Sequence, residues 1–114
     1  ELVVWGSGKP MREFLYVDDM ADACVFLMER GVSGGLFNIG TGKDVTIREL
    51  AETVMDVVGF EGRIVYDTGK PDGTPRKLLN VDRMKDLGWS ANTSLREGIT
   101  RAWADYSENR LDRT

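Results

Sequence analysis

The segment from Thr46 to Gly59 constrains the fold most, because it carries both ends of a helix and an apolar face. Thr46 and Glu49 have the spacing of a capping box, in which each side chain reaches a free backbone N–H group. Gly59 stands where a C-terminal glycine of left-handed conformation belongs. A helix is therefore predicted between them, with one apolar face made by Ile47, Leu50, Ala51, Val54, Val57 and Val58.

Two more helix starts carry polar signals. Ser94 and Glu97 form a second capping box, which opens a predicted last helix before a polar tail expected to fray from residue 109 onward. Asp18 or Asp19 is expected to cap an earlier helix, because a carboxylate accepts from free backbone N–H groups. Cys24 lies on the apolar stripe of that helix. We therefore interpret the two aspartates as caps rather than an acid–base or metal pair, and Cys24 as a packed core thiol.

Short strands complete a mixed fold. Aromatic and β-branched residues between glycine and proline turns favour strands over residues 2–5, 12–17, 36–39 and 63–67. A short helix is predicted from Asp82 to Leu87, and Gly88 ends it. The intervening stretch from Thr68 to Lys77 holds two prolines and two glycines and is predicted to be an irregular loop.

Composition narrows the function classes. At 114 residues the chain fits one domain with one modest core. Its formal charge of −4 argues against sequence-independent nucleic-acid binding, which needs a basic surface. With no histidine and one cysteine, no zinc site and no internal disulfide are expected. No apolar run is long enough to cross a membrane and no signal peptide is visible, so we expect a cytoplasmic protein.

Two stretches have the spacing of catalytic or phosphate-binding motifs but lack their context. Tyr66 and Lys70 have a Tyr-x-x-x-Lys spacing, which lowers a phenol pKa only where one helical turn brings both together. Tyr66 ends a predicted strand, and a glycine and a proline flank Lys70, so the spacing is interpreted as a coincidence. The Gly40–Lys43 stretch lacks a further glycine and the hydroxyl of a phosphate loop. It is predicted to be a strand-to-helix turn, whose backbone N–H groups could still meet a ligand.

Three features with cationic side chains are not required of an ordinary solvated surface. Trp5 and Arg12 bracket a Gly-Ser-Gly turn, Arg63 opens an apolar strand, and KPDGTPRK (residues 70–77) holds three cations in eight residues. Guanidinium groups bind phosphates bidentately, lysines bind them as point charges, and an indole offers a flat face to a sugar or base. In a net acidic protein this pattern predicts an anion pocket. The alternative is a solvated basic loop.

Three stretches resemble the C-terminal third of the GDP-L-fucose synthases: WGSGKPMREFLYVDDMADA, FNIGTGKDVTIRELAETV and KPDGTPRKLLNVDRMKDLGW. The similarity runs from Val3 to Asn109. Its REF-x-x-V-x-D and N-x-G-x-G parts occur widely in the extended short-chain dehydrogenase/reductases, whereas the WGSG-x-P-x-REF and KPDG-x-PRK combination is more particular. The resemblance implies an α+β fragment. Residues 1–114 would be the small substrate domain of an α/β Rossmann-type enzyme, with its N-terminal Rossmann domain outside this chain.

The resemblance also implies an activity that this chain cannot perform alone. The family converts GDP-4-keto-6-deoxy-D-mannose to GDP-L-fucose by epimerising two carbons and reducing the ketone with NADPH. The N-terminal domain binds NADP(H) and supplies the catalytic Ser, Tyr, Lys, Cys and His. We therefore expect no catalytic, cofactor-binding or metal-binding residue in this chain. The expected partners are the GDP-sugar and the Rossmann domain, and the full-length protein is expected to be a homodimer.

Substrate binding is what the resemblance assigns to this chain. Trp5, Arg12, Arg63 and Lys77 match positions of the family's GDP-sugar site. Arg12 and Arg63 would hold the diphosphate, Trp5 would pack on the sugar or nucleotide, and Lys77 would add positive charge. Asp72 would accept from the base or ribose. Two alternatives remain: a UDP- or dTDP-sugar epimerase or dehydratase of the same superfamily, and a noncatalytic nucleotide-sugar-binding or interaction module.

Overall fold

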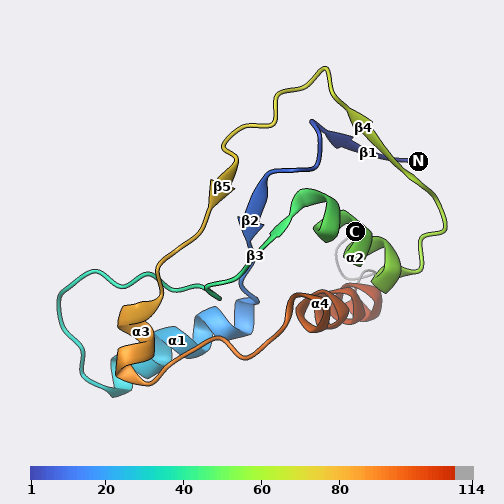
Figure 1. The fold of residues 1–114 in the computed structure, drawn as a ribbon. Coiled ribbons are helices and arrows are strands. Elements are labelled where there is room, and N and C mark those ends of the chain that lie inside the picture. The colour runs from blue at the N-terminus through green and yellow to red at the C-terminus, as the bar shows by residue number, and fades with distance from the viewer. Residues whose placement is uncertain (110–114) are drawn as a thin grey trace.

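The computed structural model describes residues 1–109. Figure 1 shows an open arrangement: one strand pair lies at one end, a second sheet lies in the middle, and α1 and α3 lie at the opposite end. The Cα radius of gyration is 16.8 Å, against about 13 Å for a compact domain of this size. In chain order the elements are β1 (Leu2–Trp5), β2 (Met11–Glu13), α1 (Val17–Glu29), β3 (Asp44–Thr46), α2 (Ile47–Val58), β4 (Ile64–Asp67), β5 (Arg76–Lys77), α3 (Asp82–Leu87) and α4 (Leu95–Asn109).

The strands form two small sheets. β1 and β4 pair in parallel, with Leu2 opposite Ile64 and Trp5 opposite Asp67. In the second sheet the central strand β2 pairs antiparallel with β3 and parallel with β5. The long connection from β4 to β5 crosses over the top of the molecule in Figure 1 and brings residues 76–77 back beside β2. Segments far apart in sequence therefore meet at β2.

Helix α2 has the predicted bounds, and the Thr46 half of its capping box is as predicted, whereas Glu49 binds the Thr46 hydroxyl instead of a backbone N–H group. The Thr46 hydroxyl oxygen accepts the Glu49 N–H at 3.0 Å, and the Glu49 carboxylate accepts the Thr46 hydroxyl at 3.1 Å. Gly59 follows the helix at a φ of 73°. The N–H groups of the first two helical residues donate to the carbonyls of Pro10 and Gly8, each at 3.0 Å. The turn that precedes β2 thus completes the cap of α2 and fixes the sheet to this helix.

The first predicted strand–helix junction is wrong in two respects. The strand expected over residues 12–17 ends at Glu13, and α1 already begins at Val17. The residue before α1 is Tyr16, in an extended conformation, and no side chain caps the helix. Asp19 instead is buried and accepts the Thr93 N–H and hydroxyl at 3.0 and 3.2 Å. A carboxylate in the first turn of a helix can bind a distant segment instead of capping the helix end.

Two apolar assignments are corrected as well. Cys24 is exposed, because α1 packs through the neighbouring Ala23 face onto α3. Residues 36–39 form a loop rather than a strand, although Phe37 and Ile39 still pack against the core. That core consists of Ala23, Met84 and Trp89, with Phe26, Leu27 and Ala91 partly buried around it.

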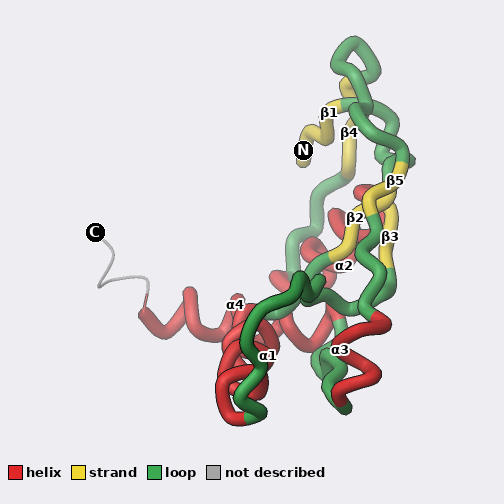
Figure 2. The backbone as a smooth tube through the Cα atoms, turned by 90° about the vertical axis from the view of Figure 1, so that its left-hand side faces the viewer, coloured by secondary structure: helices red, strands yellow, loops and turns green. Residues whose placement is uncertain are grey.

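The irregular loop predicted over residues 68–77 is wrong at its end, because Arg76 and Lys77 form β5 beside β2, and the sequence patterns did not predict β3. The other predicted elements are confirmed. β4 begins one residue later than expected, α3 covers residues 82–87 as predicted, and Gly88 follows α3 at a φ of 99°. At α4 the Ser94 hydroxyl accepts the Glu97 N–H at 3.2 Å. Figure 2 shows β1 and β4 at one end of the tube, with α1, α3 and α4 at the other. Of the tail expected to fray, residues 110–114 lie outside the described part of the chain.

Candidate functional site

The three-stranded sheet separates its charges by face. Residues that pair across strands share a face of a sheet, and successive residues alternate between faces. Arg12 pairs with Val45 of β3 on one side and with Lys77 of β5 on the other. Lys43 and Phe14 follow the same alternation. This cationic face (Arg12, Phe14, Lys43, Val45 and Lys77) carries three cations and no carboxylate.

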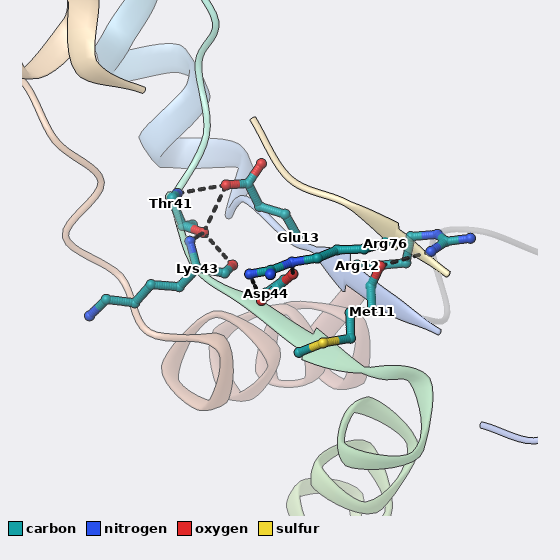
Figure 3. Close-up of polar contacts among 8 residues, drawn as sticks. Met11, Arg12, Glu13, Thr41, Lys43, Asp44 and Arg76 are labelled. Atoms are coloured by element: carbon teal, nitrogen blue, oxygen red, sulfur yellow. Dashed lines mark hydrogen bonds and ion pairs between the residues drawn. The ribbon is translucent and has the colours of Figure 1, made fainter. Parts of the chain in front are cut away.

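The opposite face of the same sheet is neutralised. Asp44 accepts from Arg76 in an ion pair of 2.7 Å, with the Asp44 side chain only 7% exposed. Glu13 accepts the Gly42 N–H at 2.6 Å. Figure 3 shows both carboxylates engaged by these partners, while the Arg12 guanidinium points away from them and donates to the Met11 carbonyl at 2.7 Å. Asp44 and Glu13 therefore already have hydrogen-bonding partners, and they lie on the face of the sheet opposite Arg12.

The cations of the open face lack anionic partners. Within residues 1–109, none of the ion pairs involves Arg12, Lys43 or Lys77. Like charges on directly opposed strand positions repel each other, so the Arg12–Lys77 neighbourhood destabilises the sheet unless an anion lies nearby. Arg12 and Lys43 also line a pocket of about 380 Å³. The segment Ala91, Asn92, Thr93, Ser94 and Leu95 belongs to the same lining.

A second cluster surrounds Trp5 at the end of β1. Trp5 is 70% exposed, and the Lys70 ammonium lies 5.0 Å from its ring centroid. The next residues form the GSG turn (residues 6–8). Asp72, from the proline loop (residues 68–75), accepts the Ser7 N–H at 2.6 Å and the Ser7 hydroxyl at 2.8 Å. These two hydrogen bonds, first the one from the backbone, lower the pKa of Asp72.

Glycine is required where the proline loop meets the GSG turn. Gly6 has a φ of 86°, in the left-handed region. A Cβ atom added to it would lie 2.2 Å from Asp72 Oδ1. A side chain at this position would therefore be strained and would displace the carboxylate. The Gly-Ser-Gly sequence that flanks Trp5 creates the room for this contact.

The structure brings together four of the five predicted site residues in two neighbouring groups. Arg12 and Lys77 are strand partners, and Trp5 and Asp72 flank the GSG turn. The proline loop connects the groups, because it starts beside Trp5 and ends beside β2. Arg63 is not among them. It precedes β4, whereas Trp5 pairs with the last residue of β4, a separation of about 13 Å along the strand. Arg63 pairs with Glu1 at 2.7 Å.

The two motif-like stretches behave as turns and strands. Tyr66 lies in β4 and Lys70 in the turn after it, so no helix unites them. In the GTG turn (residues 40–42) the Gly42 N–H donates to Glu13, and the following Lys43 N–H donates to the Thr41 hydroxyl at 3.1 Å. The Gly42 and Lys43 N–H groups are therefore occupied within the chain.

Sequence reasoning missed Lys43, Ser7 and the 91–95 segment as parts of the site. Lys43 was visible only as part of an incomplete phosphate loop, and its place on the same face as Arg12 depends on the pairing of β2 with β3. Ser7 gave no signal because its partner is 65 residues away. Within the described chain no helix has the length and apolar character of a membrane span, and no group of three potential metal ligands occurs.

Comparison with known proteins gives the context of this site. Residues 1–40 match the NAD dependent epimerase/dehydratase family. The chain is 54% identical over 113 residues to GDP-L-fucose synthase 1 of Arabidopsis thaliana, covering 99% of this chain and 35% of that protein. It is 51% identical over 118 residues to the GDP-L-fucose synthase of Escherichia coli (strain K12), covering 96% and 37%. The chain thus spans about a third of the length of the curated relatives that it matches.

A solved structure supports the same relationship. The chain resembles a GDP-L-fucose synthetase from Naegleria fowleri bound to NADP, with a TM-score of 0.86 and 29% sequence identity, over 96% of this chain and 35% of that one. The resemblance inferred from the three sequence stretches is therefore confirmed over nearly the whole chain. The expected fold class is confirmed too: the chain is a small α/β piece that matches part of Rossmann-type epimerase and reductase structures.

Proposed function

We propose that this chain is the GDP-sugar-binding portion of an NADPH-dependent epimerase/reductase that converts GDP-4-keto-6-deoxy-D-mannose to GDP-L-fucose. The similarity to GDP-L-fucose synthases supports the family, and one structural observation supports the binding role. Arg12 and Lys77 are strand neighbours on a face that provides neither of them with an anion. A diphosphate between them would remove their mutual repulsion and accept charge-assisted hydrogen bonds. Trp5 would pack on the sugar or nucleotide.

Arg63 and Asp72 would take different parts in binding the nucleotide sugar. Arg63 lies at the far end of the β1–β4 pair, so it would contact only a distal part of an extended nucleotide sugar. Asp72 already accepts two hydrogen bonds from Ser7. Its predicted contact with base or ribose would have to use the remaining acceptor positions of the carboxylate.

The cofactor belongs elsewhere in the proposed enzyme. NADPH would supply the hydride that reduces the ketone, and a Rossmann domain outside this chain would bind it. In the GTG turn, whose sequence partly matches a phosphate loop, the Gly42 N–H and the following Lys43 N–H donate to groups of this chain. The contribution of these residues is therefore to bind and orient the GDP-sugar. We also propose a homodimeric, cytoplasmic enzyme, on the family resemblance alone.

The experiment is a calorimetric titration of the full-length protein that carries this chain with GDP. Arg12→Ala should weaken binding by about 2 kcal/mol, the size of a lost charged hydrogen-bonding partner. Arg96→Ala is a matched control, because Arg96 is an exposed arginine that pairs with Asp56 between α4 and α2. Equal affinities of the wild type and Arg12→Ala would contradict the proposal.

UDP and dTDP-glucose serve as competing ligands in the same titration. Binding of either more tightly than GDP would favour the alternative epimerase or dehydratase of the superfamily. A full-length protein that binds GDP but leaves GDP-4-keto-6-deoxy-D-mannose and NADPH unconverted would favour the noncatalytic module.

A further inference from the structure

We propose that Asp72 is a positioning residue of the nucleotide-sugar site, which acts through Ser7 by fastening the proline loop to the GSG turn. The inference rests on the proposed function and adds to it a residue whose role is to hold other binding groups in place. It differs from the role that the resemblance implies for Asp72, which is direct contact with the base or ribose.

The contacts of Asp72 carry the inference. One carboxylate oxygen accepts the Ser7 N–H at 2.6 Å, and the other accepts the Ser7 hydroxyl at 2.8 Å. Both oxygens thus serve one residue that lies 65 positions away. Gly6 supplies the room for this approach, since any Cβ there would meet Asp72 Oδ1 at 2.2 Å. We call these two hydrogen bonds the Ser7–Asp72 clasp. The clasp joins a serine flanked by glycines to an aspartate that packs closely against the turn.

The clasp is the main attachment of an otherwise free loop. Among the described residues, the other hydrogen bonds of residues 68–74 are local, from the Gly69 and Lys70 N–H groups to Asp67. The loop is next fixed at Pro75, whose carbonyl accepts the Met11 N–H at 2.8 Å. Between these anchors the backbone depends on Asp72 for its position.

Binding groups stand on both sides of this attachment. Two residues before Asp72, the Lys70 ammonium covers the Trp5 ring at 5.0 Å. One residue after it, Gly73 lies beside the Arg12 guanidinium, with 3.9 Å from an ideal Cβ position to Nη2. Opening the clasp would therefore release Lys70 from Trp5 and remove the loop from the side of Arg12. A ligand would then have to order the loop at its own expense.

A double-mutant cycle separates positioning from direct contact. In the full-length protein, Asp72→Ala should raise the Kd for GDP about tenfold, and Ser7→Ala, which removes one of the two bonds, about threefold. The double variant should match Asp72→Ala alone, because Ser7 has nothing left to hold. Asp72→Asn keeps an acceptor for the Ser7 N–H and should recover part of the loss. Asp56→Ala, at another exposed aspartate, is the matched control.

Direct contact predicts a different pattern and would overturn the inference. Ser7→Ala would then leave the Kd unchanged, or its effect would add in full to that of Asp72→Ala. Hydrogen exchange gives a readout independent of the ligand: Asp72→Ala should speed exchange of the Ser7 amide, and unchanged protection would also overturn the inference. A wild-type protein that fails to bind GDP overturns the proposed function instead, so the two failures are distinguishable.

Discussion

Two glycine turns of the chain are held by the same kind of hydrogen bond, from a backbone N–H to a carboxylate, but the two carboxylates differ in burial. In the GSG turn the Ser7 N–H donates to Asp72, and in the GTG turn the Gly42 N–H donates to Glu13, both at 2.6 Å. In each turn a glycine lies where a Cβ would collide with that carboxylate. Glu13 is a half-buried residue of the central strand β2, whereas Asp72 belongs to an exposed loop. The same hydrogen bond therefore serves two purposes.

Burial decides which purpose each bond serves. A hydrogen bond shielded from water is costly to lose, because the abandoned N–H group finds no solvent partner. The Glu13 bond fixes the GTG turn to the sheet and so contributes to folding. The Asp72 bond is exposed, so its loss should change the position of a loop more than the stability of the fold. Asp19, which accepts the Thr93 N–H and is only 7% exposed, is the most buried of these three carboxylates.

The largest expected effect is at Asp19. Asp19→Ala should destabilise the protein by about 3 kcal/mol, because it leaves the Thr93 N–H and hydroxyl without their buried acceptor. Urea denaturation of the full-length protein measures the loss. Asp18→Ala is the matched control, since Asp18 is exposed in the same first turn of α1 and should cost about 0.5 kcal/mol at most. Equal losses would show that both aspartates act as helix-end charges.

A smaller loss is expected at Glu13. Glu13→Ala should cost about 2 kcal/mol in the same denaturation experiment, because the Gly42 N–H loses a charged acceptor at a half-buried site. Glu13→Gln retains an oxygen for that N–H and should lose about half as much. If both variants unfold like the wild type, the GTG turn does not depend on this bond and the contrast with Asp72 disappears.

Most of the fold could be predicted from local sequence patterns. The Thr46 cap, Gly59 and the 82–87 helix follow from residues a few positions apart, and the structure confirms them. The errors concern partners that are distant in sequence. Asp19 was assigned to its own helix end because nothing nearby announces Thr93, 74 residues away. Residues 36–39 have the composition of a strand, but a strand needs a neighbour, and none pairs with them in the described chain.

The candidate site divides along the same line. Arg12 and Lys77 were predicted from residue type and resemblance, and no sequence pattern showed that they would be strand partners. Lys43 joined them only through the β2–β3 pairing. Spacing along the chain could not show that Arg63 lies at the opposite end of its strand pair from Trp5, because that depends on the parallel register. Chemistry was readable from the sequence, whereas proximity required the sheet topology.

Gly6 allows backbone strain and the clasp to be separated. Gly6→Ala should cost about 1 kcal/mol for its left-handed φ, and its Cβ should also displace Asp72. Gly31→Ala is the matched control, because Gly31 has a φ of 64° and no atom within 4 Å of an added Cβ. Both variants should lose similar stability in urea, but only Gly6→Ala should speed amide exchange at Ser7. Unchanged Ser7 exchange in Gly6→Ala would mean that the carboxylate relocates without releasing the turn.

The smallest effect on stability is expected from titrating Asp72, and it tests whether the exposed clasp is local. The hydrogen bonds from Ser7 lower the pKa of Asp72, so their contribution is fully present above the ordinary aspartate pKa of about 3.9 and is lost as the pH falls through the lowered value. At neutral pH the clasp is therefore intact. Acidification should speed Ser7 amide exchange, after correction for its intrinsic pH dependence, before the fold unfolds. In Asp72→Asn, which cannot titrate, this acid step should vanish; if it persists, another carboxylate controls the loop.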